Sequence, residues 1–186
     1  LLAQGARAIL MACNMSSAIA LADARRLHPA IPVVGVIEAG ARAAVQVAQG
    51  PIGVLATSGT VNSEAYPRAI ARLKPGIPVF QTACPEFVPL IEAGEIEGPR
   101  AAEAVRQCLA PGLAEGVRTF ICGCTHYPFL LPVMRALAPE GTRFVDPARE
   151  AAAEILHGLG SRLKTEGGAR YVLSAPTETF RPVGSR

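Results

Sequence analysis

Short apolar runs recur along this sequence and alternate with amphipathic stretches, and this alternation restricts the fold more than any other feature. Each run holds five to seven residues and is bounded by Gly, Pro or small polar residues. Continuous apolar runs of this length are typical of parallel strands that are buried on both faces. The expected strands are residues 6–12, 31–37, 51–57, 77–83, 117–123, 142–146 and 169–174.

Helix patterns lie between these runs, with Pro and Gly at the joins. The expected helices are residues 16–27, 63–73, 98–109 and 130–138. Strands that alternate with helices predict open α/β sheets, in which ligands bind at the carboxyl ends of the strands.

Composition narrows the class of protein further. Half of the residues are hydrophobic and 18% are charged, so the chain can bury a core and should be globular. The net charge of +3 comes from dispersed residues with no basic block, so nucleic acid is not an expected partner. No apolar run reaches the roughly 18 residues of a membrane span, so a membrane is not expected either. The five cysteines are odd in number and irregularly spaced, which favours a reducing, cytoplasmic compartment.

Two cysteine turns share one design. "ILMACNMSSAIAL" (9–21) and "FICGCTHYPFLL" (120–131) each read strand, small residue, Cys, polar residue and helix start. This repetition predicts two pseudo-symmetric α/β domains whose cleft holds both thiols, Cys13 and Cys124. We expect residues 38–145 to form the second domain, and residues 1–37 and 146–186 to form a first domain that is incomplete.

The two turns indicate acid–base chemistry. A helix start exposes backbone N–H groups that favour an anion and lower the pKa of a nearby thiol. Asn14 and Thr125, which follow the two cysteines, offer hydrogen bonds to a small ligand that carries a carboxylate or an ammonium group. Two opposed thiols suit a reaction that needs a base on one face of a carbon and an acid on the other.

Other interpretations of these residues stay open at this point. Free cysteines are commonly small buried hydrophobes, which is our interpretation of Cys84, Cys108 and Cys122. Cys122, Cys124 and His126 form a C-x-C-x-H cluster with potential zinc ligands, although no C-x-x-C partner exists. A Cys-His hydrolase built on Cys124 and His126 would leave Cys13 unexplained.

The remaining polar motifs say less about function. The two other histidines, His28 and His157, are expected to face solvent. "GTVNS" (59–63), with Thr57 before it, is either a carboxylate-binding turn or a helix cap. No Walker or dinucleotide-binding glycine pattern is present, so no cofactor is indicated.

Six segments together resemble bacterial glutamate racemase, in the order that the family has them: "ACNMSSA", "PVVGVIEAGARAAV", "IGVLATSGTVNSEAY", "CPEFVPLIEAG", "GCTHYP" and "FVDPA". The resemblance covers nearly all of the chain. It implies a two-domain, cofactor-independent enzyme that interconverts L- and D-glutamate, without a metal, and supplies D-glutamate for peptidoglycan.

Residue by residue, the resemblance implies that Cys13 and Cys124 are the acid–base thiols and that His126 assists Cys124. Glu92 matches a family carboxylate near the site, and it fits a solvated helix residue equally well. Four residues match family positions that hold the polar groups of the substrate amino acid: Asn14, Thr57, Thr60 and Thr125.

The sequence departs from the family pattern in two ways. Met15 stands where the family has a Thr, so a substrate-facing hydroxyl is replaced by a thioether. The resemblance also implies a preceding segment with an Asp-Ser-Gly turn and a Pro-Tyr-Gly turn, which this chain lacks. A non-catalytic fragment or binding protein is therefore one alternative. A racemase of the same family that acts on aspartate is another, because it would share this architecture. A homodimer stays open.

Overall fold

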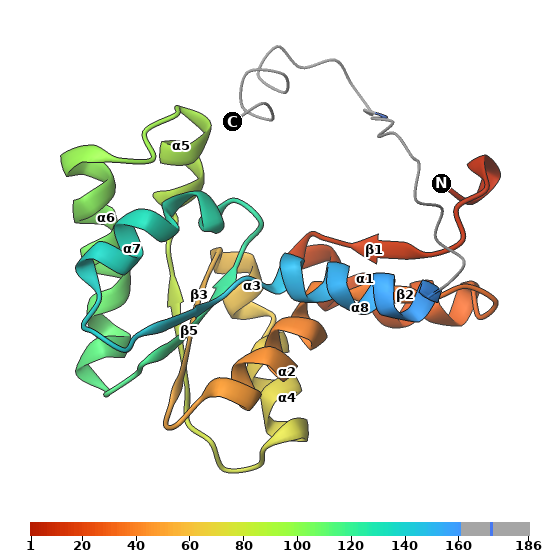
Figure 1. Ribbon diagram of the computed structural model, residues 1–186, viewed down its shortest axis with the longest axis horizontal. Coiled ribbons are helices and arrows are strands. Elements are labelled where there is room, and N and C mark those ends of the chain that lie inside the picture. Colours follow the sequence, from red (N-terminus) through yellow and green to blue (C-terminus); the bar gives the residue numbers. More distant parts are fainter. Residues whose placement is uncertain (161–171, 173–186) are drawn as a thin grey trace.

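The chain folds into two parallel β-sheets of unequal size, with helices packed around them (Figure 1). The computed structural model describes residues 1–160 and 172. In the small sheet, β1 (Ile9–Met11) pairs with β2 (Val33–Gly35). The large sheet has the order β4-β3-β5-β6, formed by β3 (Ile52–Ala56), β4 (Val79–Ala83), β5 (Thr119–Gly123) and β6 (Arg143–Val145). The predicted α/β class is confirmed.

The helices connect these strands in chain order. The α-helices are α1 (Asn14–Leu27), α2 (Val36–Val47), α3 (Ser58–Asn62), α4 (Ala65–Leu73), α5 (Phe87–Glu92), α6 (Gly98–Ala114), α7 (Leu131–Leu137) and α8 (Pro147–Leu159). Two short 3-10 helices, η1 (Leu2–Gln4) and η2 (Tyr127–Leu130), complete the set in the described part of the chain.

Six of the seven predicted strands are confirmed, and the seventh, 169–174, lies outside the described residues apart from Val172. The four predicted helices correspond to α1, α4, α6 and α7. The predicted strand 31–37 was too long, because β2 ends at Gly35 and α2 begins at Val36. Val36 and Ile37 prolong the apolar run into the first turn of a buried helix, and a run of apolar residues does not distinguish the two structures.

The large sheet has a hydrophobic core on each face. One core joins it to α5, α6 and α7, and the other joins it to α2 and α4, as the ribbon shows (Figure 1). Every residue of β3 and β5 is buried, as expected of central strands. Each fully buried large side chain contributes about 1.5–3 kcal/mol, so the carboxyl ends of these two strands are firmly held.

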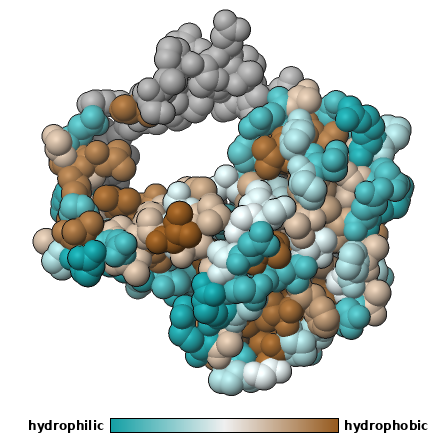
Figure 2. Space-filling model, turned by 180° about the vertical axis from the view of Figure 1, so that it is seen from behind, coloured by the Kyte–Doolittle hydropathy of each residue, from teal (hydrophilic) through white to brown (hydrophobic). Residues whose placement is uncertain are grey.

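A smaller lobe consists of β1, β2, α1 and α8 and has its own small core. Val34, Val36, Ala39 and Ala151 pack together there, while β1 is only half-buried. Figure 2 shows apolar side chains gathered on the surface of this lobe, and its exposed large apolar residues include Ile19 and Leu156. The small lobe therefore buries less apolar surface than the large sheet does.

Helix α2 belongs to both lobes. Ile37, Ala41 and Ala44 pack on the large sheet, whereas Val36 and Ala39 pack in the small core. The predicted domain boundary at 37/38 falls in the first turn of this helix, so the division of the chain stays a prediction. None of the helices that the structure describes has the length and the apolar character needed to cross a membrane.

Candidate functional site

The carboxyl ends of the parallel strands bring together most of the predicted site residues. Thr57 follows β3, Cys84 follows β4, Cys124 follows β5 and Asp146 follows β6. Because all four strands are parallel, these residues lie along one edge of the large sheet. Cys13 follows β1 in the small sheet and begins α1. The site is therefore built from strand ends, as is usual for open α/β sheets.

Gly123, the last residue of β5, lets this strand pack closely against β3 directly before Cys124. A side chain at Gly123 would place its Cβ 2.8 Å from the Cβ of Ala56 and 2.9 Å from the carbonyl oxygen of Leu55. Both atoms belong to the neighbouring strand β3, which is fully buried and has no room to move. A glycine is thus required at the residue before the cysteine.

Cys13 is the N-cap residue of α1 and is exposed. Ser17, one turn into the helix, donates to the carbonyl oxygen of Met11 at 2.7 Å and accepts from the N–H of Val36 at 3.2 Å, which fixes this turn. Burial raises the pKa of the Cys13 thiol, but the N–H and hydroxyl of Ser16 and the N–H of Met15 outweigh it, so the pKa lies below its usual value. The helix start thus favours the thiolate.

Cys124 has the opposite tendency. It is half-buried, and burial raises the pKa of its thiol above the usual value. The N–H groups of His126, Tyr127 and Thr125 act against this rise, whereas negative charge on Cys13 adds to it. The second cysteine therefore favours the protonated thiol.

The two thiols come from different sheets, and two contacts hold the Cys13 turn against α3 and α4, the helices that follow β3. Tyr66 on α4 donates a hydrogen bond to Asn14 on α1, and the thioether of Met15 lies against Gly59 on α3, 3.1 Å from where a Cβ would stand. The Cys13 turn is therefore packed against helices of the large sheet, whose strand β3 pairs with β5, the strand that precedes Cys124.

His126 and Glu92 lie beside Cys124. The Sγ of Cys124 is 3.8 Å from Nδ1 of His126, and Nε2 of the same ring is 3.5 Å from Oε1 of Glu92. The Glu92 side chain is 66% exposed and that of His126 is 37% exposed, so the interaction between them is weak. A carboxylate, an imidazole and a thiol nevertheless lie in series.

The predicted polar residues divide into two groups. Thr57 and Thr60 face each other, with a hydrogen bond of 3.2 Å from the Thr57 hydroxyl to the Thr60 hydroxyl, and Thr60 is buried. Asn14 is also buried, whereas Thr125 is exposed beside Cys124. Asn14 and Thr125 flank the two thiols, and the threonine pair lies on the turn that Met15 contacts.

The three other cysteines are buried, as predicted. Burial, followed by the charge of Asp146, raises the pKa of Cys122 to about 12, so this thiol stays protonated. Within the described residues, no three His, Cys, Asp or Glu side chains are grouped so that they could hold a metal ion, the Cys122, Cys124 and His126 cluster included. His28 and His157 are exposed, as predicted.

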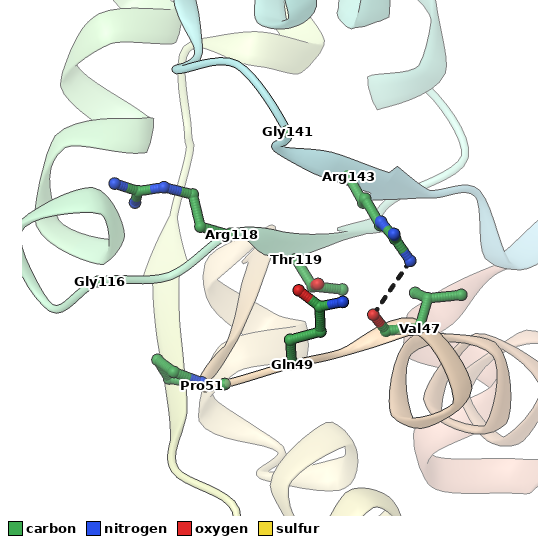
Figure 3. Close-up of a pocket in the computed structure, with 9 residues that line it drawn as sticks. Val47, Gln49, Pro51, Gly116, Arg118, Thr119, Gly141 and Arg143 are labelled. Atoms are coloured by element: carbon green, nitrogen blue, oxygen red, sulfur yellow. Dashed lines mark hydrogen bonds between the residues drawn. The ribbon is translucent and has the colours of Figure 1, made fainter.

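A polar cavity of about 160 Å³ lies at the opposite end of the large sheet (Figure 3). Gln49, Thr119 and Arg143 are among its lining residues, and Nη1 of Arg143 donates to the carbonyl oxygen of Val47 at 3.2 Å. These residues adjoin the amino ends of β3, β5 and β6, far along the strands from the cysteine turns. The cavity is separate from the candidate site.

Sequence reasoning missed three residues of this region. Ser16 acts on the Cys13 sulfur, Tyr66 binds Asn14, and Asp146 adds to the rise that burial causes in the pKa values of Tyr66 and Cys122. A hydroxyl three positions after an N-cap cysteine is a local signal for Ser16. Tyr66 is brought to Asn14 only by tertiary structure.

Known proteins resemble this chain over most of its length. The model of the family "Asp/Glu/Hydantoin racemase" matches residues 1–155. The glutamate racemase of Gloeobacter violaceus is 43% identical over 179 residues, which are 95% of this chain and 67% of that protein. The glutamate racemase of Microcystis aeruginosa is 43% identical over 176 residues, which are 92% of this chain and 62% of that protein.

A solved structure is also similar. The glutamate racemase from Francisella tularensis, in complex with D-glutamate, has a TM-score of 0.88 and 30% sequence identity, and the match covers 99% of this chain and 70% of that one. This chain therefore spans between 62% and 70% of the length of these three relatives.

Proposed function

The chain belongs to the Asp/Glu/Hydantoin racemase family, and from this premise we propose that it interconverts L- and D-glutamate by acid–base catalysis with two thiols. The observation that carries this proposal is the pair of free thiols that follow the carboxyl ends of β1 and β5, Cys13 in the small sheet and Cys124 in the large one. Their opposite pKa shifts, Cys13 lowered and Cys124 raised, support it. A thiolate facing a thiol is the arrangement that inversion at a carbon requires, because one group removes a proton and the other supplies one.

In the proposed reaction, the thiolate removes the α-proton of glutamate while the opposite thiol delivers its proton to the other face of the same carbon. One C–H bond breaks and one forms, so the product is the mirror image. The base ends as a thiol that carries the former α-proton, and the acid, having given its proton to carbon, ends as a thiolate. Each enantiomer uses a different cysteine as the base. His126, with Glu92 behind it, is placed to assist proton transfer at Cys124.

Four residues are proposed to hold the polar groups of the amino acid: Asn14, Thr57, Thr60 and Thr125. Asn14 and Thr125 each follow one of the thiols, and the Thr57 and Thr60 hydroxyls lie on the turn after β3. We further propose that no cofactor takes part, that the D-glutamate serves peptidoglycan synthesis and that the protein acts in the cytoplasm. The names of the relatives and the free cysteines support this extension.

Exchange of the α-hydrogen with deuterated solvent tests the mechanism, measured in single turnovers for each enantiomer separately. A serine hydroxyl is far less acidic than a thiol and fails as a base. C13S and C124S should therefore each impair exchange of the two enantiomers unequally, and in opposite senses. C108S, at a buried cysteine outside the site, is the matched control. Equal slowing of both enantiomers by C13S and C124S would rule out the two-base assignment.

A second candidate function is binding without turnover, which Met15 favours because a thioether stands where the resemblance implies a substrate-facing hydroxyl. Calorimetric binding of L-glutamate without appearance of D-glutamate would favour it. Racemisation of aspartate in place of glutamate in the same assay would identify the third candidate, a racemase of the same family with a shorter substrate.

A further inference from the structure

A buried hydrogen bond joins the two lobes beside Cys13. The hydroxyl of Tyr66, on α4, donates to Oδ1 of Asn14, the first residue of α1, at 2.7 Å. Tyr66 is fully buried and Asn14 is 4% exposed. Since Asn14 directly follows Cys13, this single bond ties the cysteine turn of the small lobe to the core of the large sheet.

The tyrosine is held firmly and acts as a donor. Burial, followed by the charges of Cys122, Asp146 and Cys124, raises the pKa of the Tyr66 hydroxyl well above its usual value, so the hydroxyl stays protonated. Glycines make room for the ring, because a Cβ at Gly40 would stand 3.4 Å from its hydroxyl oxygen and a Cβ at Gly123 would stand 3.3 Å from its Cε2. The direction of the bond to Asn14 is thus fixed.

This direction decides what Asn14 can offer a ligand. An amide has an acceptor oxygen and an NH₂ group with two donors. Tyr66 occupies the oxygen, whereas Nδ2 makes no hydrogen bond within the part of the chain that the structure describes. Nδ2 is not fully buried, since none of the fully buried side-chain polar atoms without a partner in the described residues belongs to Asn14. Two N–H donors are therefore free at the residue next to Cys13.

We propose that Tyr66 is a positioning residue that fixes the Asn14 amide with its NH₂ group toward the ligand, so that this side of the site accepts a carboxylate and rejects an ammonium group. A carboxylate is an acceptor only, whereas an ammonium group is a donor only. This inference rests on the proposed function, since glutamate offers both groups, and it adds which of them lies beside Asn14.

The test is a double-substitution cycle on binding of L-glutamate, measured by calorimetry with Y66F, N14A and the double variant. Y66F keeps the ring and removes only the hydroxyl, so the Asn14 oxygen loses its donor and the amide is free to turn. Binding should weaken about tenfold, as expected from the loss of one well-oriented hydrogen bond to a charged group. In the N14A background, the same substitution should change binding less than twofold.

Two further variants separate positioning from a general loss of structure. N14D keeps an oxygen for Tyr66, so it should retain the midpoint of thermal unfolding, but its second oxygen repels a carboxylate and binding should weaken at least tenfold. Y127F removes an equally buried hydroxyl, which donates to the carbonyl oxygen of Cys84 at 2.9 Å. Its effect on binding should be the same with and without N14A.

The inference is overturned if Y66F leaves the affinity unchanged, if it weakens binding equally in the N14A background, or if N14D binds L-glutamate as the unsubstituted chain does. An unsubstituted chain that does not bind L-glutamate contradicts the proposed function instead. In that case the same cycle on the thermal midpoint decides: coupling between positions 14 and 66 supports the fixed amide, and additivity overturns it.

Discussion

The two cysteine turns have the same local design and lie in very different surroundings. Cys13 follows a three-residue strand of a two-stranded sheet and is exposed. Cys124 follows a five-residue strand that is buried throughout and is itself half-buried. Backbone N–H groups act on both sulfurs, yet the pKa of the Cys13 thiol is lowered and that of the Cys124 thiol is raised.

The difference shows that the turn alone does not set the protonation state of a thiol. At Cys13, the N–H groups and the Ser16 hydroxyl outweigh burial. At Cys124, burial outweighs the N–H groups, and negative charge on Cys13 adds to the rise in pKa. A thiol with a lowered pKa and a thiol with a raised pKa are suited to removing a proton and supplying one in the same turnover.

The largest expected effect comes from removing either sulfur. C13A and C124A should each lower the rate of racemisation by about 10³-fold or more in both directions, because each thiol acts in every turnover and general acid–base groups contribute about 10²–10⁴-fold. Polarimetry that starts from L-glutamate and from D-glutamate measures this, with C108A as the control. A variant of either turn that keeps normal racemisation would show that the two turns do not act together.

The rigidity of the Cys124 turn is tested at the residue before it. G123A would press a methyl group onto the Leu55 carbonyl and Ala56, so the free energy of unfolding should fall by about 1–3 kcal/mol. G50A is the matched control, since a Cβ at Gly50 meets nothing within 4 Å, and it should stay within about 0.5 kcal/mol of the parent. Denaturant titration compares the two. Equal stability of G123A and G50A would contradict the close packing of β5 on β3.

The third prediction concerns His126 and Glu92, which lie beside Cys124. H126N should slow racemisation roughly tenfold, because the imidazole nearest the Cys124 sulfur is lost while both thiols remain. E92Q should slow it about twofold to threefold, since its contact with His126 is largely exposed to solvent. Steady-state rates give both numbers, and H157N, at an exposed position on α8, serves as the control. A larger effect of E92Q than of H126N would reverse the proposed order of the series.

The smallest effect is expected at Met15, where the Cys13 turn has a thioether in place of a hydroxyl. M15T should tighten binding of L-glutamate about twofold to threefold through one added hydrogen bond, offset by the lost contact with Gly59. Calorimetry measures the change. Weaker binding by M15T would mean that the contact between Met15 and Gly59 matters more than the hydroxyl.

The sequence predicted much of this fold because its signals are local. Apolar runs located β1 to β6, the repeated turn located Cys13 and Cys124, and the resemblance added roles for His126 and Glu92. Cys124, His126 and Glu92 lie in series. The start of α2 at Val36 was missed, because a buried helix start and a strand end look alike in sequence. The role of Tyr66 and the contrast between the two thiols depend on burial and on contacts between distant segments, which local patterns do not contain.

The central claim, that one thiol of the pair favours the thiolate and the other the protonated form, is tested most directly by titrating each cysteine. Alkylation by iodoacetamide, followed by mass spectrometry of the Cys13 and Cys124 peptides over a range of pH, gives the midpoint of each thiol independently of its absolute rate. The account predicts a lower midpoint for Cys13 than for Cys124. In C13A, the Cys124 midpoint should fall, because the negative charge on Cys13 that raises it is removed. A midpoint of Cys124 at or below that of Cys13 would contradict it.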